Sequence, residues 1–502
     1  MSIRTDRDDW CVTVSIATSS LIGIRGVPVE VEVDVTTGIP AVRIVGLPDA
    51  AVGEARERIR SAIRSSGFTW PARRITVNLA PADLRKSGGS FDLAIALGIL
   101  AASGQMRIVA GPIAAIGELS LDGRVRDVPG SLPLALPLLD RDAGTVLLPR
   151  SAHQHALTHN AARRVSTLSE AVSIVEGRAV ADTATSDLGR GRGDHARVNG
   201  AAVAVDLTEI RGQPTAVRAL LIAATGRLPL LLEGPPGVGK SMLAQALHGA
   251  LPDLDGAERD EVAAIASAGG FDGADPSRPP LRTPHHDLTV AGLIGGGPRL
   301  TPGELTWAHR GLLILDEIGE YRRDTLEALR EPLERGVVDL VRAGRSVRLP
   351  GAALVVATGN PCGCGELEHA DASCRCTPTA RRRGSLALSA PIRDRFALRL
   401  RLARPSASLD ALPAGGVTTL DARRRVAAMR QELVNEPQGY HEAELLRAAS
   451  RVAAAAMERV GGRGWRHILV IARICALLNG GGEVGEAELA EALHLSGRVA
   501  AG

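Results

Sequence analysis

The pattern of apolar and polar residues along the first third of the chain predicts alternating strands and helices. Valines recur at every second position from Val27 to Val35, mostly between acidic residues, which is typical of a half-buried strand. From Val52 to Ile63 the apolar residues instead recur at helical spacing. A strand over 74–79 and a buried helix over 91–102 come next. We therefore expect residues 1–176 to form one α/β domain.

The rest of the chain divides into a mixed part and a helical part. Two short apolar runs, at Leu228–Leu232 and Gly311–Leu315, are typical of parallel strands buried on both faces. Residues 201–404 are therefore expected to form an α/β core with a parallel sheet. The tail over 419–502 is predicted to be all-helical, with helices near 420–434, 442–459, 465–479 and 486–496. Apolar periodicity fades in two segments that we interpret as linkers, 177–200 and 405–418.

Length and composition bear on the number of domains and on the cellular compartment. The 502 residues exceed what one hydrophobic core holds. A content of 45% hydrophobic and 23% charged residues is ordinary for a globular protein. The first residues lack the apolar segment of a signal peptide, and no run of about 18 uncharged apolar residues occurs. We therefore expect a cytoplasmic protein without a membrane segment. The net charge of +3 is too small to indicate a nucleic-acid partner by itself.

A glycine-rich segment after the first apolar run matches G-x-x-x-x-G-K-[ST] in full. The backbone N–H groups of such a loop surround phosphates, and the N-terminus of the following helix adds its positive end. Lys240, one of only two lysines in the chain, would contact the β- and γ-phosphates, and Ser241 would hold Mg²⁺. The alternative is a glycine-rich turn with a chance lysine. The residues expected to contact ATP here are Gly234, Pro235, Pro236, Gly237, Val238, Gly239, Lys240, Ser241 and Met242.

Two acidic residues end the second apolar run, and the same chemistry requires both of them. Asp316 would support Mg²⁺, and Glu317 would polarise the attacking water. They could instead be solvated residues at a strand end, but the phosphate-binding loop upstream argues against this alternative. The sequence therefore predicts an enzyme that binds ATP and Mg²⁺ and hydrolyses the nucleotide.

Four of the six cysteines fall in one short segment, as Cys362-x-Cys364 and Cys374-x-Cys376. Four thiolates in two close pairs can form a closed tetrahedral Zn²⁺ site. Clustered cysteines in a cytosolic protein also indicate a metal before a disulfide. The C-x-C spacing is tighter than the usual C-x₂-C. The alternatives to structural zinc are four free thiols, a redox switch, or a site in which His369 replaces one cysteine.

Short motifs are spread over nearly the whole chain. They are Gly46-Leu-Pro-Asp49, Ile75–Pro81, Phe91–Leu97, Arg282-Thr-Pro-His-His286, Gly295–Gly297, Pro302–Leu305 and Asn360-Pro-Cys-Gly-Cys364. In this order they resemble the magnesium-chelatase-like AAA+ proteins of the ComM/YifB type. The resemblance implies an N-terminal domain of the Lon-protease-like, ribosomal-S5-type α/β fold, an AAA+ P-loop core and a C-terminal helical lid. It also implies a ring, usually hexameric, that binds ATP between subunits.

The resemblance assigns roles to residues outside the two nucleotide motifs. Asn360 would be sensor 1 and report on the γ-phosphate, and Arg395 would be an arginine finger that reaches a neighbour's ATP. A surface cation is the alternative for Arg395. Arg463, expected just before a helix over 465–478, would be sensor 2, and two arginines nearby compete for that role, Arg466 and Arg473. Two positions ahead of the phosphate-binding loop fall where the family contacts adenine, Ile210 and Gln213.

A strand–turn–strand pattern over Val337–Leu349 carries arginines around its turn. The family has a β-hairpin here that points into the pore of the ring. Arginines in a pore would meet a phosphate backbone, and binding would then weaken steeply with salt. The glycine-rich segment 292–303 resembles a second pore element, the helix-2 insert. A solvated hairpin face is the alternative for the arginines that are predicted to contact DNA, Arg342, Arg345 and Arg348.

We consider three functions on this basis. The ComM-like resemblance implies a motor on single-stranded or branched DNA, a ring helicase that promotes branch migration in recombination or natural transformation. The alternative is a protein-remodelling ATPase similar to the magnesium-chelatase motor subunit, which lacks the extra N-terminal domain and the cysteine segment. The third is a Lon-type protease, which needs a lysine to activate its serine. Ser90 matches the serine, but Leu132 stands where the lysine is expected and Lys86 lies near the serine loop. We therefore expect a non-proteolytic domain.

Overall fold

The computed structural model describes residues 13–47, 49–84, 86, 88–109, 111–140, 144–151, 160–178, 205–270, 275–297, 300–342, 345–362, 374, 376–381, 388–404, 416–435, 452–481 and 483–498. Contacts divide the chain into two units, which we describe separately. The first comprises Met1–Ala196 and Ala263–Ala274, and the second comprises Arg197–Val262 and Asp275–Gly502. Most of the two predicted linkers, 177–200 and 405–418, lies outside the described residues.

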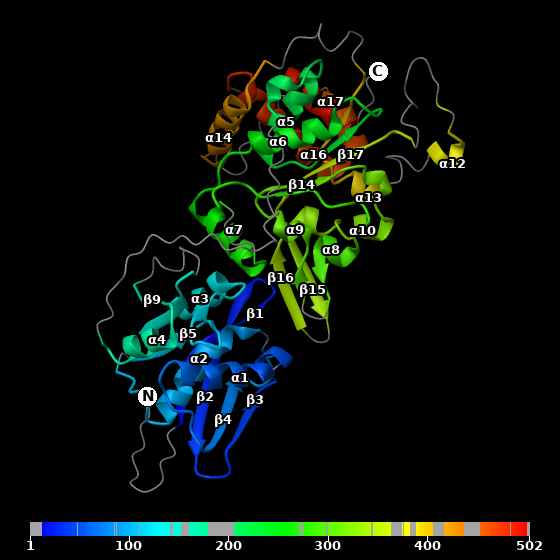
Figure 1. The fold of residues 1–502 in the computed structure, drawn as a ribbon. Helices are drawn as coiled ribbons and strands as arrows, with labels where there is room; N and C mark the ends of the chain where they lie inside the picture. The colour runs from blue at the N-terminus through cyan, green and yellow to red at the C-terminus, as the bar shows by residue number, and fades with distance from the viewer. Residues whose placement is uncertain are drawn as a thin grey trace. The chain divides into compact units, whose positions relative to one another are not determined.

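The first unit is built on a mixed seven-stranded sheet with the order β3-β4-β2-β1-β5-β8-β9 (Figure 1). The long strands β1 and β2 pair antiparallel, and β5, β8 and β9 extend the sheet in parallel. Its elements are β1 (Val14–Ile22), β2 (Arg25–Thr36), β3 (Ala41–Val45), α1 (Ala50–Ser65), β4 (Arg74–Ala80), η1 (Gly89–Phe91), α2 (Asp92–Ala102), β5 (Ile113–Ala115), β6 (Glu118–Leu119), β7 (Val125–Arg126), α3 (Ser131–Leu139), β8 (Thr145–Pro149), β9 (Ala162–Val165) and α4 (Leu168–Val175).

The residue pattern of this unit explains its layers. In β2 the valines from Val29 to Val35 are buried, whereas the acidic residues between them are partly or fully exposed, as the period of two predicts. Helix α2 is apolar on all sides, and it is buried along nearly its whole length between the sheet and α1. The predicted strands and helices of this part are confirmed within two residues at each end.

The second unit contains a five-stranded parallel sheet with the order β11-β14-β17-β10-β18. The elements are η3 (Leu207–Glu209), α5 (Pro214–Gly226), β10 (Leu230–Glu233), α6 (Lys240–Ala250), α7 (Gly256–Ala268, shared with the first unit), β11 (Leu281–Arg282), α8 (Val290–Ile294), β12 (Gly295–Gly296), β13 (Thr301–Pro302), α9 (Glu304–Trp307), β14 (Leu312–Leu315), η4 (Ile318–Glu320), α10 (Arg323–Glu327), α11 (Pro332–Arg335), β15 (Val337–Arg342), β16 (Arg345–Pro350), β17 (Leu354–Gly359), α12 (Pro378–Arg381), α13 (Ala390–Arg393), β18 (Leu398–Arg401), α14 (Thr419–Asn435), α16 (Val452–Leu478) and α17 (Glu486–Ser496).

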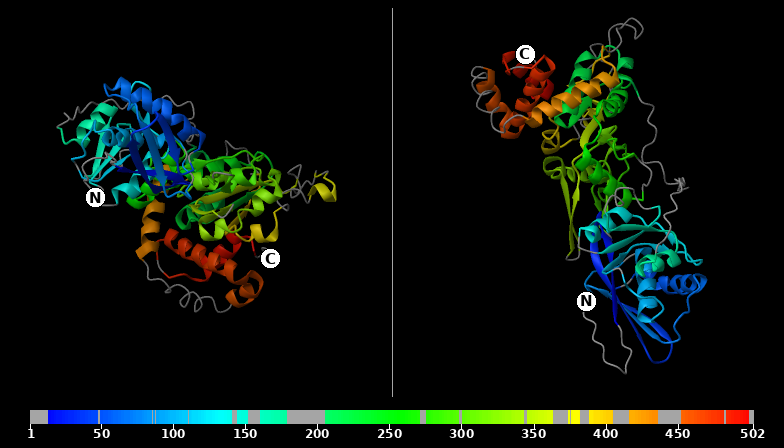
Figure 2. Two further views of the ribbon diagram at one scale, coloured as in Figure 1. Left: turned by 90° about the horizontal axis from the view of Figure 1, so that it is seen from below. Right: turned by 90° about the vertical axis from the view of Figure 1, so that its left-hand side faces the viewer.

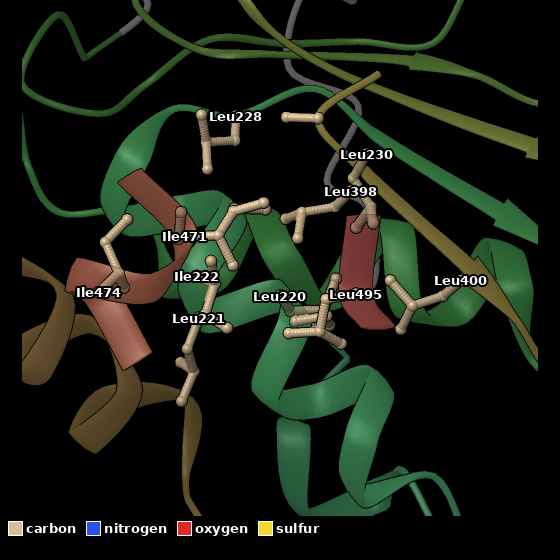
Figure 3. Packing of buried hydrophobic residues seen from close by; sticks show 14 of the residues in the cluster. Leu220, Leu221, Ile222, Leu228, Leu230, Leu398, Leu400, Ile471, Ile474 and Leu495 are labelled. Atoms are coloured by element: carbon tan, nitrogen blue, oxygen red, sulfur yellow. The ribbon is translucent and has the colours of Figure 1, made fainter. Parts of the chain in front are cut away.

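A single apolar cluster joins the sheet of this unit to its C-terminal helices. Figure 3 shows Leu220 and Ile222 of α5 packed with Leu398 of β18, Ile471 of α16 and Leu495 of α17. All five side chains are buried. The helical lid is therefore packed directly on the mixed α/β core, and the predicted parallel sheet with a helical C-terminus is confirmed.

One helical prediction is wrong. Two helices were expected near 442–459 and 465–479, but α16 is continuous from Val452 to Leu478. Glycines lie on both sides of Arg463, and they do not interrupt the helix. Gly464 instead allows close packing, because a Cβ atom there would lie 2.1 Å from a guanidinium nitrogen of Arg498. A small residue is required for contact, and the helix runs through it. Residues 442–451 lie outside the described part of the chain.

Strands β15 and β16 form a separate two-stranded hairpin, as predicted, and it projects from the second unit as its own ribbon (Figure 2). Among the helices that the structure describes, none combines the length and the apolar character that a membrane crossing requires.

Candidate nucleotide site

The phosphate-binding loop connects β10 to α6. Strand β10 ends at Glu233, and α6 begins at Lys240. Gly237 and Gly239 have φ values of 81° and 89°, a backbone region in which a side chain causes strain. Val238 between them is buried in the core of the unit. The shape of the loop therefore depends on glycine at these two positions and on an apolar anchor between them.

Lys240 extends back over this loop. Its Nζ atom donates hydrogen bonds to the carbonyl oxygens of Gly234 at 2.8 Å and Pro235 at 2.9 Å, and to Oδ1 of Asn360 at 2.9 Å. Burial lowers the pKa of Lys240, and the nearby carboxylates of Asp316 and Glu317 oppose that shift. The predicted sensor-1 residue therefore lies against the predicted phosphate-binding lysine.

Ser241 and Asp316, the two residues expected to hold Mg²⁺, also lie together. The hydroxyl of Ser241 donates to the carboxylate of Asp316, with distances of 3.0 and 3.1 Å to its two oxygens. Asp316 follows the buried strand β14, whose neighbour in the sheet is β17. Mg²⁺ prefers oxygen ligands, and in nucleotide sites these include carboxylates and a serine or threonine hydroxyl. The donor set fits the ion.

Thr358 lies between the two acidic residues. Its hydroxyl donates to Oδ1 of Asp316, and it accepts a hydrogen bond of 3.0 Å from the backbone N–H of Glu317. Glu317 has a φ of 53° and a ψ of 53°, a left-handed conformation that is uncommon for a residue with a side chain. Thr358 was not predicted. The signal was its place on β17, two residues before Asn360, because residues two apart on a strand point to the same side.

The two residues expected beside adenine come from the segment ahead of α5. Ile210 is buried, and Gln213 donates from Nε2 to the carbonyl oxygen of Ala403 at 2.9 Å. The loop touches the same segment, because a Cβ atom at Gly234 would lie 2.6 Å from the carbonyl oxygen of Leu402. Gln213 is therefore held against the segment that the phosphate-binding loop also touches, whereas Ile210 is part of the apolar core of the unit. Met242 is half-buried and packs against the core of the unit.

Arg395 and Arg463 share one carboxylate. Glu334 binds Arg395 at 3.0 Å through one oxygen and Arg463 at 2.6 Å through the other. The guanidinium of Arg463, and to a smaller extent that of Arg395, holds the pKa of Glu334 below its usual range. Arg463 lies inside α16, not ahead of a helix as expected. Glu334 was missed, since an acidic residue in a charged helix carries no signal of its long-range partners.

Arg395 lines an open hollow of about 710 Å³ on the surface of the second unit. The other lining residues are Glu327, Ala328, Arg330, Glu331, Glu334 and Arg335. Arg395 also donates to the carbonyl oxygens of Arg330 and Pro391. Within the described residues, no hydrogen bond joins Arg395 to the phosphate-binding loop or to the acidic pair. The structure therefore assembles two separate charged groups, one around Lys240 and one around Glu334.

Three of the four clustered cysteines are described, and they lie together. The Sγ atoms of Cys362, Cys374 and Cys376 lie within 4.8 Å of one another, and those of Cys362 and Cys374 are 3.7 Å apart. An S–S bond is about 2.05 Å long, so this pair is not a disulfide. Zn–S bonds of about 2.3 Å in a tetrahedral site put two sulfurs about 3.8 Å apart. The arrangement therefore fits zinc. Cys364 and His369 lie outside the described residues.

The hairpin arginines differ in their surroundings. Arg348 pairs with Asp339 across the hairpin, at 2.7 and 3.2 Å. Arg342 is exposed at the end of β15, where its backbone is in register with that of Arg345. The side chain of Arg345 lies outside the described part. The charge of Arg348 is thus partly compensated within the hairpin.

Two family models match this chain. One, described as magnesium chelatase, subunit ChlI, matches residues 206–409. The other, described as subunit ChlI of Mg-chelatase, matches residues 31–152. Competence protein ComM of Haemophilus influenzae is 34% identical over 489 residues, which cover 94% of this chain and 95% of that protein. The YifB protein of Escherichia coli is 36% identical over 421 residues, or 83% of this chain and 81% of that protein.

The chain belongs to the ComM/YifB-type magnesium-chelatase-like AAA+ family. A weaker similarity reaches outside the family, to Lon protease 2 of Bacillus subtilis, at 30% identity over 25% of this chain and 24% of that protein. The residues around Ser90 therefore bear on whether this AAA+ protein retains a protease site.

The neighbours of Ser90 in this AAA+ protein are held in structural contacts. Lys86 is fully buried, and its Nζ atom donates to the carbonyl oxygen of Pro81. Leu132, where a Lon-type lysine was expected, is buried in an apolar cluster. Asp92 is also buried, and its carboxylate lies 2.9 Å from Nε of Arg58. Among the described residues, Lys86 and Arg58 therefore form hydrogen bonds with groups other than the hydroxyl of Ser90.

Proposed function

We propose that this protein is a Mg²⁺-dependent ATPase that works as a ring-shaped motor on DNA. The observation that carries the ATPase is the contact set in which Lys240 meets Asn360 and Ser241 meets Asp316. Phosphate-binding loop, metal ligands and sensor thereby come from β10, β14 and β17, which are neighbours in one parallel sheet. Ligands bind at the carboxyl ends of such strands.

Each residue has its own task in this proposal. Lys240 would exchange its contacts with loop carbonyls for oxygens of the β- and γ-phosphates. Ser241 and Asp316 would hold Mg²⁺, which supplies positive charge beside the phosphates. Glu317 would orient and polarise the attacking water, and Asn360 would contact the γ-phosphate. Ile210 and Gln213 would contact adenine.

The arginine pair supports the ring. Arg395 and Arg463 have their ion pairs with Glu334, beside an open hollow, and not with their own phosphate-binding loop. An arginine that stabilises the transferring phosphoryl group can be supplied by a neighbouring chain. We therefore propose that Arg395 reaches the ATP of the next subunit and that Arg463 acts beside it. A closed ring, usually a hexamer in this family, satisfies every site.

The hairpin supports the DNA substrate. Arg342 is exposed on a ribbon that projects from the second unit, and arginines bind phosphate backbones independently of sequence. The Haemophilus relative is named for competence. We propose that the ring translocates on single-stranded or branched DNA and promotes branch migration. The N-terminal unit would serve as a non-proteolytic platform for assembly or substrate binding.

The cysteine cluster supports a structural zinc. Cys362, Cys374 and Cys376 would be three ligands, and Cys364 would complete a closed Cys₄ site. A closed site has no open position for a reacting water, so the zinc would hold the segment after Asn360 in shape. We propose no catalytic role for it.

The experiment that tests this function is the ATPase rate of the purified protein with and without DNA. Rates would be measured without nucleic acid, with single-stranded DNA and with a forked duplex, each across a salt series. We expect DNA to stimulate hydrolysis and the stimulation to fade as salt rises, because phosphate contacts release counterions. An ATPase that is indifferent to every DNA would contradict the DNA motor and would favour the protein-remodelling alternative.

A further inference from the structure

Thr358 is a buried hydroxyl in the middle of the candidate site, and none of the roles above uses it. It lies on β17 with 1% of its surface exposed. Its oxygen accepts the backbone N–H of Glu317 at 3.0 Å, and its hydrogen is donated to Oδ1 of Asp316. A threonine hydroxyl has one donor and two acceptor positions, so both bonds can exist at the same time.

The backbone of Glu317 needs such support. Its φ of 53° and ψ of 53° place it in the left-handed region. A residue with a Cβ is disfavoured there, and surrounding contacts must maintain the conformation. The bond from the Glu317 N–H to Thr358 acts on this residue directly. This backbone conformation sets the direction in which the Glu317 carboxylate leaves the chain.

The second bond of Thr358 acts on the proposed metal ligand. The carboxylate of Asp316 accepts one hydrogen bond from the hydroxyl of Thr358 and another from the hydroxyl of Ser241. These two donors come from different elements, strand β17 and helix α6, and together they restrict how the carboxylate can rotate. A valine at position 358 would have nearly the same shape as threonine but could make neither bond.

The place of Thr358 in the sheet links it to the sensor. Strand β17 lies between β14, which leads to Asp316, and β10, which leads to the phosphate-binding loop. Asn360 directly follows the end of this strand, and its Oδ1 accepts a hydrogen bond from Lys240. A shift of this strand therefore moves the sensor and the support of Glu317 together.

We propose that Thr358 is a positioning residue for ATP hydrolysis, which fixes the backbone of Glu317 and the carboxylate of Asp316 by one bridging hydroxyl. This inference rests on the ATPase proposed above. Thr358 touches neither nucleotide nor water in this role and acts through the two acidic residues.

The test compares Thr358→Val and Thr358→Ser with the unchanged protein, in ATPase kinetics and in equilibrium binding of a fluorescent ATP analogue. For Thr358→Val we expect kcat to fall by about tenfold or more, because small misplacements of catalytic groups cost up to about 10²-fold. We expect KM and nucleotide affinity to stay within about threefold, because the phosphate-binding loop is unaffected. Thr358→Ser keeps the hydroxyl and should retain most of kcat.

Thr225→Val is the matched control. Thr225 is a buried threonine of α5, and its hydroxyl donates to the carbonyl oxygen of Leu221 at 2.8 Å, so its loss removes one buried hydrogen bond elsewhere in the same unit. This variant should keep the kcat of the unchanged protein. If Thr358→Val does not fold, as judged by thermal melting, Thr358→Ala removes the hydroxyl without adding a methyl group and should show the same loss of kcat.

Several results would overturn the proposal. Unchanged kcat in Thr358→Val, or equal loss in Thr358→Ser and Thr358→Val, would mean that the hydroxyl positions nothing. Failure of the proposed function looks different. In that case the unchanged protein would have no ATPase activity, or an activity that Lys240→Ala does not remove. The Thr358 proposal would then be wrong as well.

Discussion

The Nζ atom of Lys240 lies 2.9 Å from the Oδ1 atom of Asn360, which joins the phosphate-binding loop to strand β17. A lysine has three N–H donors and no acceptor. The other two contacts of Lys240 are the loop carbonyls of Gly234 and Pro235. ATP would offer phosphate oxygens to the same donors. We therefore infer that Asn360 and Lys240 separate, or admit an oxygen between them, when nucleotide binds.

Lys240→Ala should weaken ATP binding by tenfold or more, roughly the effect of losing a hydrogen bond to a charged group. Titration with a fluorescent ATP analogue measures this change. Asn360→Ala is the comparison. It should affect turnover more than affinity, because Asn360 would meet only the γ-phosphate. Wild-type affinity in Lys240→Ala would show that the loop does not hold phosphates.

Glu317→Gln should bind ATP with near-normal affinity and hydrolyse it about 10²–10⁴-fold more slowly, because the amide cannot act as a general base. Single-turnover hydrolysis of radiolabelled ATP, measured alongside nucleotide binding, separates the two effects. Glu320→Gln, in the following turn, is a control that should keep its rate. A full ATPase rate in Glu317→Gln would mean that another group activates the water.

Arg395→Ala should lower the turnover rate by about 10³-fold and leave ATP binding intact. Subunit mixing tests whether Arg395 acts on a neighbour. Arg395→Ala subunits bind ATP, and Lys240→Ala subunits still carry Arg395, so a mixture should regain activity that neither variant has. Co-purification of differently tagged subunits shows that mixed rings form. Co-assembled rings without activity would argue that Arg395 acts within its own chain or not at all.

Arg342→Ala should reduce DNA-stimulated ATPase more than Arg348→Ala. The reason is that Arg348 is paired with Asp339, whereas the guanidinium of Arg342 is exposed. In a plot of the logarithm of DNA affinity against the logarithm of salt concentration, Arg342→Ala should reduce the slope by about one unit. ATPase without DNA should be equal in both variants. The reverse order of effects would mean that the Arg348 pair opens on DNA and that its charge matters more.

One zinc per chain is expected by elemental analysis of the purified protein, and Cys374→Ser should lower that content. Cys475→Ser is the control, because Cys475 is buried in α16 and has no place in the cluster. Removal of zinc by a chelator should lower the melting temperature, since ligands that bind only the folded state stabilise it. Metal-free protein with wild-type stability would contradict a structural zinc.

The sequence predicted well whatever depends on local pattern. Apolar runs in Leu228–Leu232 and Gly311–Leu315 identified two parallel strands, because strands buried on both faces carry no polar alternation. The hairpin over Val337–Leu349 followed from strand–turn–strand periodicity. Contacts between distant residues were beyond reach. Nothing near Glu334 in sequence indicates that it binds both Arg395 and Arg463, which lie 61 and 129 positions away.

The wrong helix boundary has a physical explanation. Glycine destabilises a helix by about 1 kcal/mol relative to alanine, and glycines lie on both sides of Arg463. Tertiary packing outweighs this cost, because Gly464 lets Arg498 approach the helix. Thr358 was passed over for a different reason. A buried threonine in a strand is ordinary, and its place two residues before Asn360 does not show that its hydroxyl contacts Asp316 and the backbone of Glu317.

The continuity of α16 also has a mechanical consequence. Its 27 residues span about 40 Å at 1.5 Å per residue, and Arg463 sits partway along this rod. Because the helix is continuous through the glycines, we expect a change at Arg463, such as the loss of its bond to Glu334, to be transmitted along it. The helix would then act as a lever, so that a tilt of a few degrees at one point becomes a displacement of ångströms at its far end.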